Sequence, residues 1–272
     1  MGARYSSAPS FYLFNIEGLA HVESVCNVCR SAAKTGSSGA LTIEICPAAV
    51  ARAMGCMIAV LLVFHGAVMY AWLALGYDTM VGIVRMFDVA AETNIPTWYA
   101  SMTFLACALV LGLIAAAKHS QADAFRWQWT ALSALFVFLS IDEAAVMHET
   151  FQKVIRLAFD STNTFHALAG LAFPAIVGGT VLFFGWRWMR SLPAQTLVHF
   201  VVAALIFGSG AVGVDFVSDY LTRTASPGKA AVAALRTLEE SLEMFGVAVF
   251  MYGLLTYLGN HGSPISIRVP RS

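Results

Sequence analysis

Long apolar segments alternate with short polar ones along most of the chain. Six of these segments are long enough to cross a membrane, because about 20 predominantly apolar residues span the hydrocarbon layer as a helix. They cover residues 50–76, 97–117, 127–149, 164–188, 195–220 and 230–258. The pattern therefore predicts an all-α fold, a polytopic transmembrane bundle of about six spans.

The beginning of the chain lacks this pattern. Residues 1–48 show no sustained hydrophobic period, and they do not start with the basic stretch and apolar run of a secretory signal. We expect a flexible or non-core N-terminal segment at 1–48, a six-span membrane domain at 49–260 and a short C-terminal tail at 261–272. Met54, directly before the first span, is an alternative start of the protein.

Composition supports the membrane assignment. Hydrophobic residues make up 58% of the chain and charged residues 12%, whereas soluble domains carry about 25% charged residues. The formal net charge is +0, so no overall positive field favours nucleic acid as a partner. The lipid bilayer is the expected partner, and a lipid or other small molecule is the expected kind of substrate.

Basic residues predict the orientation of the spans. Lys and Arg are more numerous in cytoplasmic loops, and a cytoplasmic N-terminus places the larger number of them inside. These inner residues are Arg52, Lys118, Arg126, Arg187, Arg190, Arg268 and Arg271. We expect a multi-pass protein of a cell membrane of the bacterial inner-membrane type, with both termini in the cytoplasm.

Two of the apolar segments carry several ionisable residues. Charged side chains are costly inside a bilayer, so such residues are candidates for a functional site. The third span contains Asp142, Glu143, His148 and Glu149, and the sixth contains Glu239, Glu240 and Glu243. In the predicted topology both groups lie in the outer half of the membrane, with four further polar residues near the same level: Glu92, His166, Asp215 and Asp219.

Helical spacing relates these residues to one another. Asp142 and Glu149 fall on nearly the same helix face, but a rise of roughly 10 Å separates them, which is too far for one ion to bind both directly. Glu239 and Glu243 are i,i+4 neighbours, and Glu240 and Glu243 are i,i+3 neighbours. We expect the two helices to face each other across an acidic, histidine-containing cavity.

A metal site is the first interpretation of this cavity. Carboxylates with a histidine suit iron, manganese, zinc or calcium. The predicted ligands are Asp142, His148, Glu149, Glu239 and Glu243. Glu143 and Glu240 are then the catalytic candidates, one of them as general base, in a metal-dependent membrane enzyme that acts on a lipid or hydrophobic substrate. Glu92, His166, Asp215 and Asp219 would complete the polar cavity.

Two other interpretations remain open. The acids could carry protons or cations in a transporter, and Gly208, Gly210 and Gly213 of the fifth span would permit close packing or a helix break. Alternatively, the acids could only hold helices together, with Arg236 paired to Glu240 four residues later. Whether the protein is an enzyme is left undecided by the sequence.

The pair Glu239-Glu240 resembles the glutamate pair of the CAAX-processing and bacteriocin-immunity type intramembrane proteases. Their pattern has an arginine four residues after the second glutamate, and Met244 occupies that position here. The Glu-x-x-His repeat of carboxylate-bridged metal sites is also absent from the sequence. The sequence motifs therefore assign no family.

Overall fold

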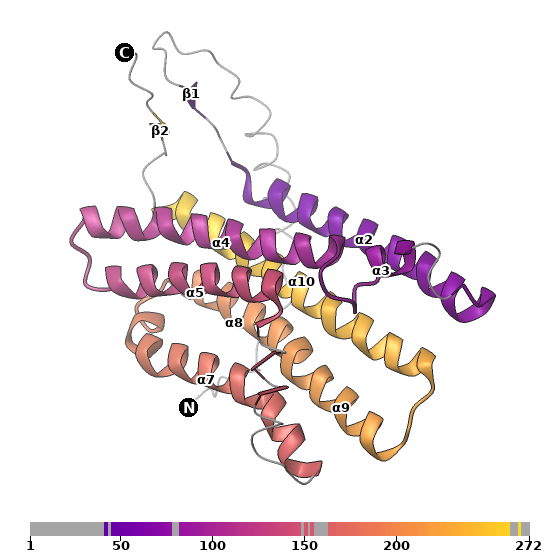
Figure 1. Cartoon of the computed structure of the whole chain (residues 1–272). Coiled ribbons are helices and arrows are strands. Elements are labelled where there is room, and N and C mark those ends of the chain that lie inside the picture. Colours follow the sequence, from indigo (N-terminus) through magenta and orange to yellow (C-terminus); the bar gives the residue numbers. More distant parts are fainter. Residues whose placement is uncertain are drawn as a thin grey trace, which may run out of the picture. The chain divides into compact units, whose positions relative to one another are not determined.

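Helices form nearly all of the described backbone in the computed structural model of the chain. The structure describes residues 41–42, 45–77, 82–147, 150–151, 153–154, 163–261 and 266–267, without the side chains of 41–42, 163–173, 223 and 266–267. The helices are α2 (Pro47–Leu75), α3 (Ile83–Phe87), α4 (Ile95–Ser120), α5 (Arg126–Ala145), α7 (Asn163–Met189), α8 (Ala194–Gly208), the π-helix η2 (Ser209–Val214), α9 (Asp215–Thr224) and α10 (Lys229–His261) (Figure 1).

Four of the described helical segments are long and apolar enough to cross a membrane by length and composition. They are α2, α4, the continuous segment Ala194–Thr222 and α10. Large apolar side chains such as Val63, Phe183 and Leu205 are exposed on the outer faces of their helices, where a bilayer would cover them. The all-α fold is thus confirmed for the helical unit, and its four long apolar helices fit a membrane protein.

The other two predicted spans correspond to α5 and α7. α5 has 20 residues and carries Asp142 and Glu143 near its end. The first eleven side chains of α7 lie outside the description, so its apolar surface is described only in part. A bundle of six spans therefore remains a prediction for these two helices.

The third predicted span, residues 127–149, ends earlier than the hydrophobic pattern indicated. Val146 has φ 55° and ψ 40°, and its backbone N–H donates to the carbonyl of Asp142. This left-handed conformation is rare for a β-branched residue, and it ends the regular helix. α5 therefore ends before Glu149, which lies outside the described residues, so the common face of Asp142 and Glu149 stays a prediction.

α4 and α5 form an antiparallel pair. The Ser101 and Ser140 hydroxyls each donate to the other residue's carbonyl at 2.8 Å, and the Ser133 hydroxyl donates to the carbonyl of Ala108 at 2.9 Å. These bonds fix the register of the two helices. They also place the end of α5, with Asp142 and Glu143, beside the beginning of α4.

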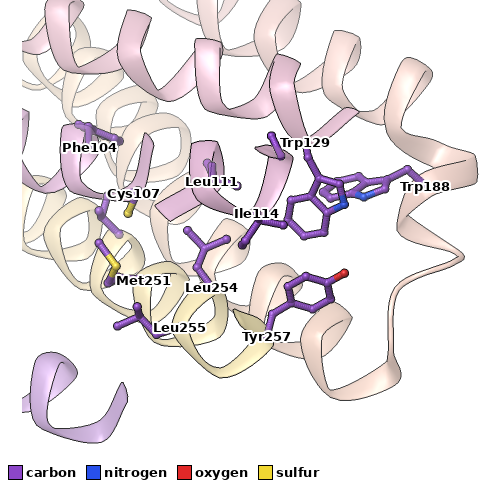
Figure 2. Packing of buried hydrophobic residues seen from close by; sticks show 12 residues of the cluster. Phe104, Cys107, Leu111, Ile114, Trp129, Trp188, Met251, Leu254, Leu255 and Tyr257 are labelled. Carbon is purple, nitrogen blue, oxygen red and sulfur yellow. The ribbon is translucent and has the colours of Figure 1, made fainter. Parts of the chain in front are cut away.

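α10 packs against α2, α4 and α8. Aromatic side chains connect it to α5: Phe136 stacks on Phe250 with ring centroids 4.7 Å apart, and Trp129 stacks on Tyr257 at 4.8 Å. The main buried cluster lies between these helices (Figure 2). Its labelled members are Phe104, Cys107, Leu111, Ile114, Trp129, Trp188, Met251, Leu254, Leu255 and Tyr257.

Two short strands lie near the ends of the chain. β1 (Leu41–Thr42) pairs antiparallel with β2 (Ser266–Ile267). They belong to a unit separate from the helices. Most of the predicted flexible segment 1–48 and of the tail 261–272 lies outside the described residues, so the predicted domain limits are not tested.

Candidate functional site

Three glutamates line one small cavity inside the helical unit. Glu143 comes from the last turn of α5, and Glu240 and Glu243 come from α10. The remaining lining residues are Ala100, Thr103 and Phe104 of α4, and Met244 and Val247 of α10. The volume of ≈ 10 Å³ has room for about one water molecule or one ion.

More carboxylates surround this cavity. Glu92 and Glu239 lie within electrostatic range of Glu240, and Asp215 lies within that range of Glu243. These residues come from the loop before α4, from α10 and from α9. Together with Glu143 of α5, the acids of four segments therefore converge on one place. The structure thus brings together Glu143 and the α10 acids, which are far apart in the sequence.

Arg236 is a basic neighbour of this acidic cluster. Its guanidinium Nη1 lies 3.7 Å from Oε2 of Glu239, one helical turn along α10. The sequence had suggested a pair between Arg236 and Glu240, but the ion pair forms with Glu239. The Arg236 side chain is half exposed, whereas that of Glu239 is buried, and the positive charge of Arg236 also acts on Glu240.

Other predicted site residues take different places. Asp142 is buried, but Glu143 and not Asp142 lines the cavity. Asp219 lies one turn beyond Asp215 on α9 and outside the cavity lining. His148 and Glu149 lie outside the described residues, and so does the side chain of His166. Their predicted roles as ligands or cavity residues are not tested.

The loop that carries Glu92 is held firmly at the start of α4. The Asn94 carboxamide accepts a hydrogen bond from the backbone N–H of Thr97 at 3.0 Å, which caps the helix. Its amide group donates to the carbonyls of Arg85 at 3.0 Å and Asp88 at 2.6 Å. One side chain therefore joins α3, the loop and α4, and it fixes the backbone two residues after Glu92.

A π-helix lies directly against the acids of α10. A Cβ atom on Gly210 of η2 would lie 2.7 Å from the carbonyl oxygen of Glu239 and 3.2 Å from Cγ of Glu243. Only glycine permits this close approach, as its position among Gly208 and Gly213 had suggested. π-helical turns are rare and often occur at functional sites. η2 therefore forms part of the wall beside the acidic cluster.

His65 is a polar residue near the site that was not among the predicted site residues, since a lone histidine in an apolar helix is more often a hydrogen-bonded core residue than a ligand. It is buried in α2, where Nε2 lies 2.7 Å from Oγ1 of Thr237 and Nδ1 accepts the backbone N–H of Val89 at 3.2 Å. With Nδ1 used as an acceptor, Nε2 carries the proton and donates to Thr237. His65 thus ties α2 to α10 two residues before Glu239.

A metal site is not formed by the residues that the structure describes. Among them, no group of three or more His, Cys, Asp or Glu residues is arranged to hold an ion. The predicted ligands His148 and Glu149 are not among these residues. Metal binding therefore remains a prediction.

The family of the chain is shown by comparison with known proteins. Residues 54–258 match a family described as "Domain of unknown function (DUF8692)". The chain belongs to this family. The DUF8692 match extends from α2 to α10 and so includes Glu143, Glu240 and Glu243. No curated protein and no solved structure matches the chain.

Proposed function

We propose that the protein is an integral membrane protein whose glutamate cavity binds a cation. The observation that supports this function is that Glu143, Glu240 and Glu243, from two helices, line one cavity with room for about one water molecule or ion. A cavity of this size suits a proton or a single metal ion, and it is too small for a lipid substrate.

Electrostatics give the physical reason for cation binding. Several ionised carboxylates at close range repel one another, and inside a membrane they also lose their hydration. Either a proton or a bound cation relieves both costs. Oxygen ligands of this kind suit hard ions such as calcium or manganese, and also iron or zinc when a histidine joins them.

In the enzymatic form of this proposal, the ion is a divalent metal that polarises a lipid or other hydrophobic substrate. Glu143 or Glu240 would act as the general base. The substrate would have to reach the ion from the side of the bilayer, since a cavity of this size does not admit a lipid.

The π-helix favours a second form, transport of a proton or cation. Gly210 of η2 lies against the backbone of Glu239 and the side chain of Glu243, and π-helical turns inside α-helices often occur at functional sites. A change of η2 to regular α-helix would alter the wall of the cavity and so expose the bound cation to one side or the other.

Substitution of single carboxylates tests cation binding. Glu240→Gln and Glu143→Gln keep the side-chain size but remove the charge, and Asp219→Asn is the matched control outside the cavity. The described residues alone form no group of three ligands arranged to hold a metal ion, so a divalent ion would need a further ligand such as the predicted His148 or Glu149. With that ligand, we expect the detergent-purified protein to retain one divalent ion per chain, measured by metal analysis after incubation with each metal. The two glutamate variants should bind the ion at least about tenfold more weakly. Loss of a residue that only hydrogen-bonds to a metal ligand already lowers metal affinity by about this factor.

Flux measurements in proteoliposomes separate the two forms. Proton or cation flux that Glu240→Gln abolishes, without stoichiometric metal in the purified protein, indicates transport. If neither metal nor flux is found, and the variants only lower the melting temperature, the carboxylates hold helices together and the proposed function is wrong.

A further inference from the structure

A second cavity lies at the opposite end of α4 and α10. Its volume is ≈ 70 Å³, and residues from four helices and two turns line it, among them Lys118, Asp123, Trp129, Trp188 and Tyr257. This volume holds several water molecules or one compact polar group. Along α4, Lys118 is roughly 22 Å from the glutamate cavity at 1.5 Å per residue, so the two cavities are separate.

An unsatisfied hydrogen-bond donor is buried in the wall of this cavity. Trp188 is 4% exposed, and its indole Nε1 has no hydrogen-bond partner in the described part of the chain. The ring is held edge-on against Trp129, with centroids 5.0 Å apart (Figure 2). A buried donor without a partner is costly and rare, so the indole N–H indicates that an acceptor binds in the cavity.

Lys118 and Tyr257 provide further donors in the same cavity. The ammonium of Lys118 lies 5.8 Å from the centroid of the Tyr257 ring and 3.3 Å from Oδ2 of Asp123. Arg126 does not line the cavity, but it adds a second positive charge beside it, since its guanidinium donates to the carbonyl of the lining residue Asp123 at 3.2 Å. Two cations against one carboxylate leave one positive charge in excess, which suits a ligand that carries a single negative charge.

We propose that this cavity binds the phosphate of an anionic membrane lipid. A phosphodiester carries one negative charge and only acceptor oxygens, which the indole N–H, the ammonium and the phenol can all bind. The cavity also lies among tryptophan, tyrosine and basic residues at the ends of helices, where membrane interfaces place them. Basic pockets between membrane helices on the cytoplasmic side commonly hold lipid head groups.

The position of the cavity explains why a lipid is a better ligand than a free anion. It lies between the turn that joins α4 to α5 and the turn that joins α7 to α8. α7 presents exposed apolar side chains such as Phe183 and Phe184 along its length. Acyl chains can lie along such a surface while the phosphate enters the cavity at the helix ends.

Lipid binding to the full-length, detergent-purified protein tests this proposal. The probes are phosphatidylglycerol, zwitterionic phosphatidylcholine and inorganic phosphate, and native mass spectrometry measures the bound fraction. We expect one phosphatidylglycerol per chain and much weaker binding of phosphatidylcholine. Trp188→Phe keeps an aromatic ring but removes the donor, and it should weaken phosphatidylglycerol binding roughly tenfold or more, as loss of a hydrogen bond to a charged group does.

Two further variants make the result decisive. Trp186→Phe changes an exposed tryptophan on the same helix and should bind phosphatidylglycerol as the unmodified protein does. Lys118→Gln leaves the aromatic packing in place and should weaken binding as Trp188→Phe does, so the test stands even if Trp188→Phe does not fold. Thermal melting without added lipid reports on folding.

Three results would overturn the proposal. The first is equal binding of phosphatidylglycerol and phosphatidylcholine. The second is unchanged phosphatidylglycerol binding in both folded variants. The third is binding of inorganic phosphate without binding of phosphatidylglycerol, which would show a site for a soluble anion. None of these results bears on the glutamate cavity, so the two proposals can fail independently.

Discussion

Asp123 shows how one carboxylate organises the turn between α4 and α5. Its Oδ1 accepts the backbone N–H of Phe125 at 2.7 Å, and its Oδ2 lies 3.3 Å from the ammonium of Lys118. The hydrogen bond from Phe125 is the main cause that lowers the pKa of Asp123 below its usual value, and Lys118 and Arg126 contribute in the same direction. The folded protein therefore favours the ionised carboxylate.

This lowered pKa predicts how stability depends on pH. The contribution of Asp123 is full above the unfolded-state pKa of about 4 and is lost as the pH falls through the lower folded-state value. Asp123→Asn should lower the free energy of unfolding by about 1 kcal/mol at neutral pH and reduce the loss of stability in acid. Thermal melting at several pH values measures both effects. If the difference in melting temperature between the variant and the unmodified protein is the same at all pH values, this prediction is wrong.

At the residue scale, the sequence predicted which segments would carry the acids but not which side chains would meet. Asp142 and Glu143 are neighbours whose side chains point about 100° apart on a helix, and only packing against α4 selects Glu143 for the cavity. Trp188 was recognisable as an interfacial aromatic residue. The indole N–H of Trp188 is buried without a partner because Trp129 and the turn before α8 pack around it. The periodicity of the sequence does not predict this packing.

Close contact between α8 and α10 depends on glycine at a defined position. A Cβ atom on Gly246 would lie 2.7 Å from the backbone nitrogen of Phe207 and 2.9 Å from its Cα. Because the obstructing atoms belong to the backbone, a side-chain movement cannot relieve the clash. α8 would have to move away from α10.

Gly246→Ala should therefore destabilise the protein by about 1–3 kcal/mol, the usual cost of an overpacked core, although alanine favours helix formation by up to about 1 kcal/mol over glycine. Gly66→Ala is the control, because a Cβ atom on Gly66 of α2 would meet no neighbouring element of the described chain within 4 Å. It should leave stability unchanged or raise it. Unfolding in mixed detergent micelles measures both variants, and equal stabilities would show that α8 and α10 are not in close contact.

At the scale of elements, the lengths of the apolar segments predicted the positions of the helices well and the residues at which they end less well. The segments predicted at 97–117 and 230–258 correspond to α4 and α10. The end of α5 was missed because Val146 gives no sequence signal for a left-handed conformation. The glycines at 208, 210 and 213 did indicate a departure from regular helix, and η2 occupies that part of the chain.

Across the whole molecule, the two cavities define two ends of the helical unit. The turn at Gln121 belongs to the end with Lys118 and Arg126, and the turn at Ser226 precedes α10 at the end with the acids. Opposite ends of a membrane-spanning unit face opposite sides of the bilayer. The distribution of basic residues predicts that the Gln121 end faces the cytoplasm.

Single cysteines test this orientation. In a chain without its five native cysteines, Gln121→Cys should be protected from a membrane-impermeant maleimide in intact cells, and Ser226→Cys should be labelled. Permeabilised cells, in which both should react fully, provide the control. Labelling of both cysteines in intact cells, or of neither, would mean that the two turns lie on one side and that the predicted spans are wrong.

α10 provides side chains to both cavities, Glu240 and Glu243 to one and Tyr257 to the other. Glu243 and Tyr257 are roughly 21 Å apart along a continuous helix, which moves as a stiff rod. If a lipid phosphate at Tyr257 shifts this rod, the affinity of the glutamates for their cation changes, and by thermodynamic reciprocity the cation changes the affinity for the lipid by the same factor. The lipid composition of the membrane would then act as an effector of cation binding.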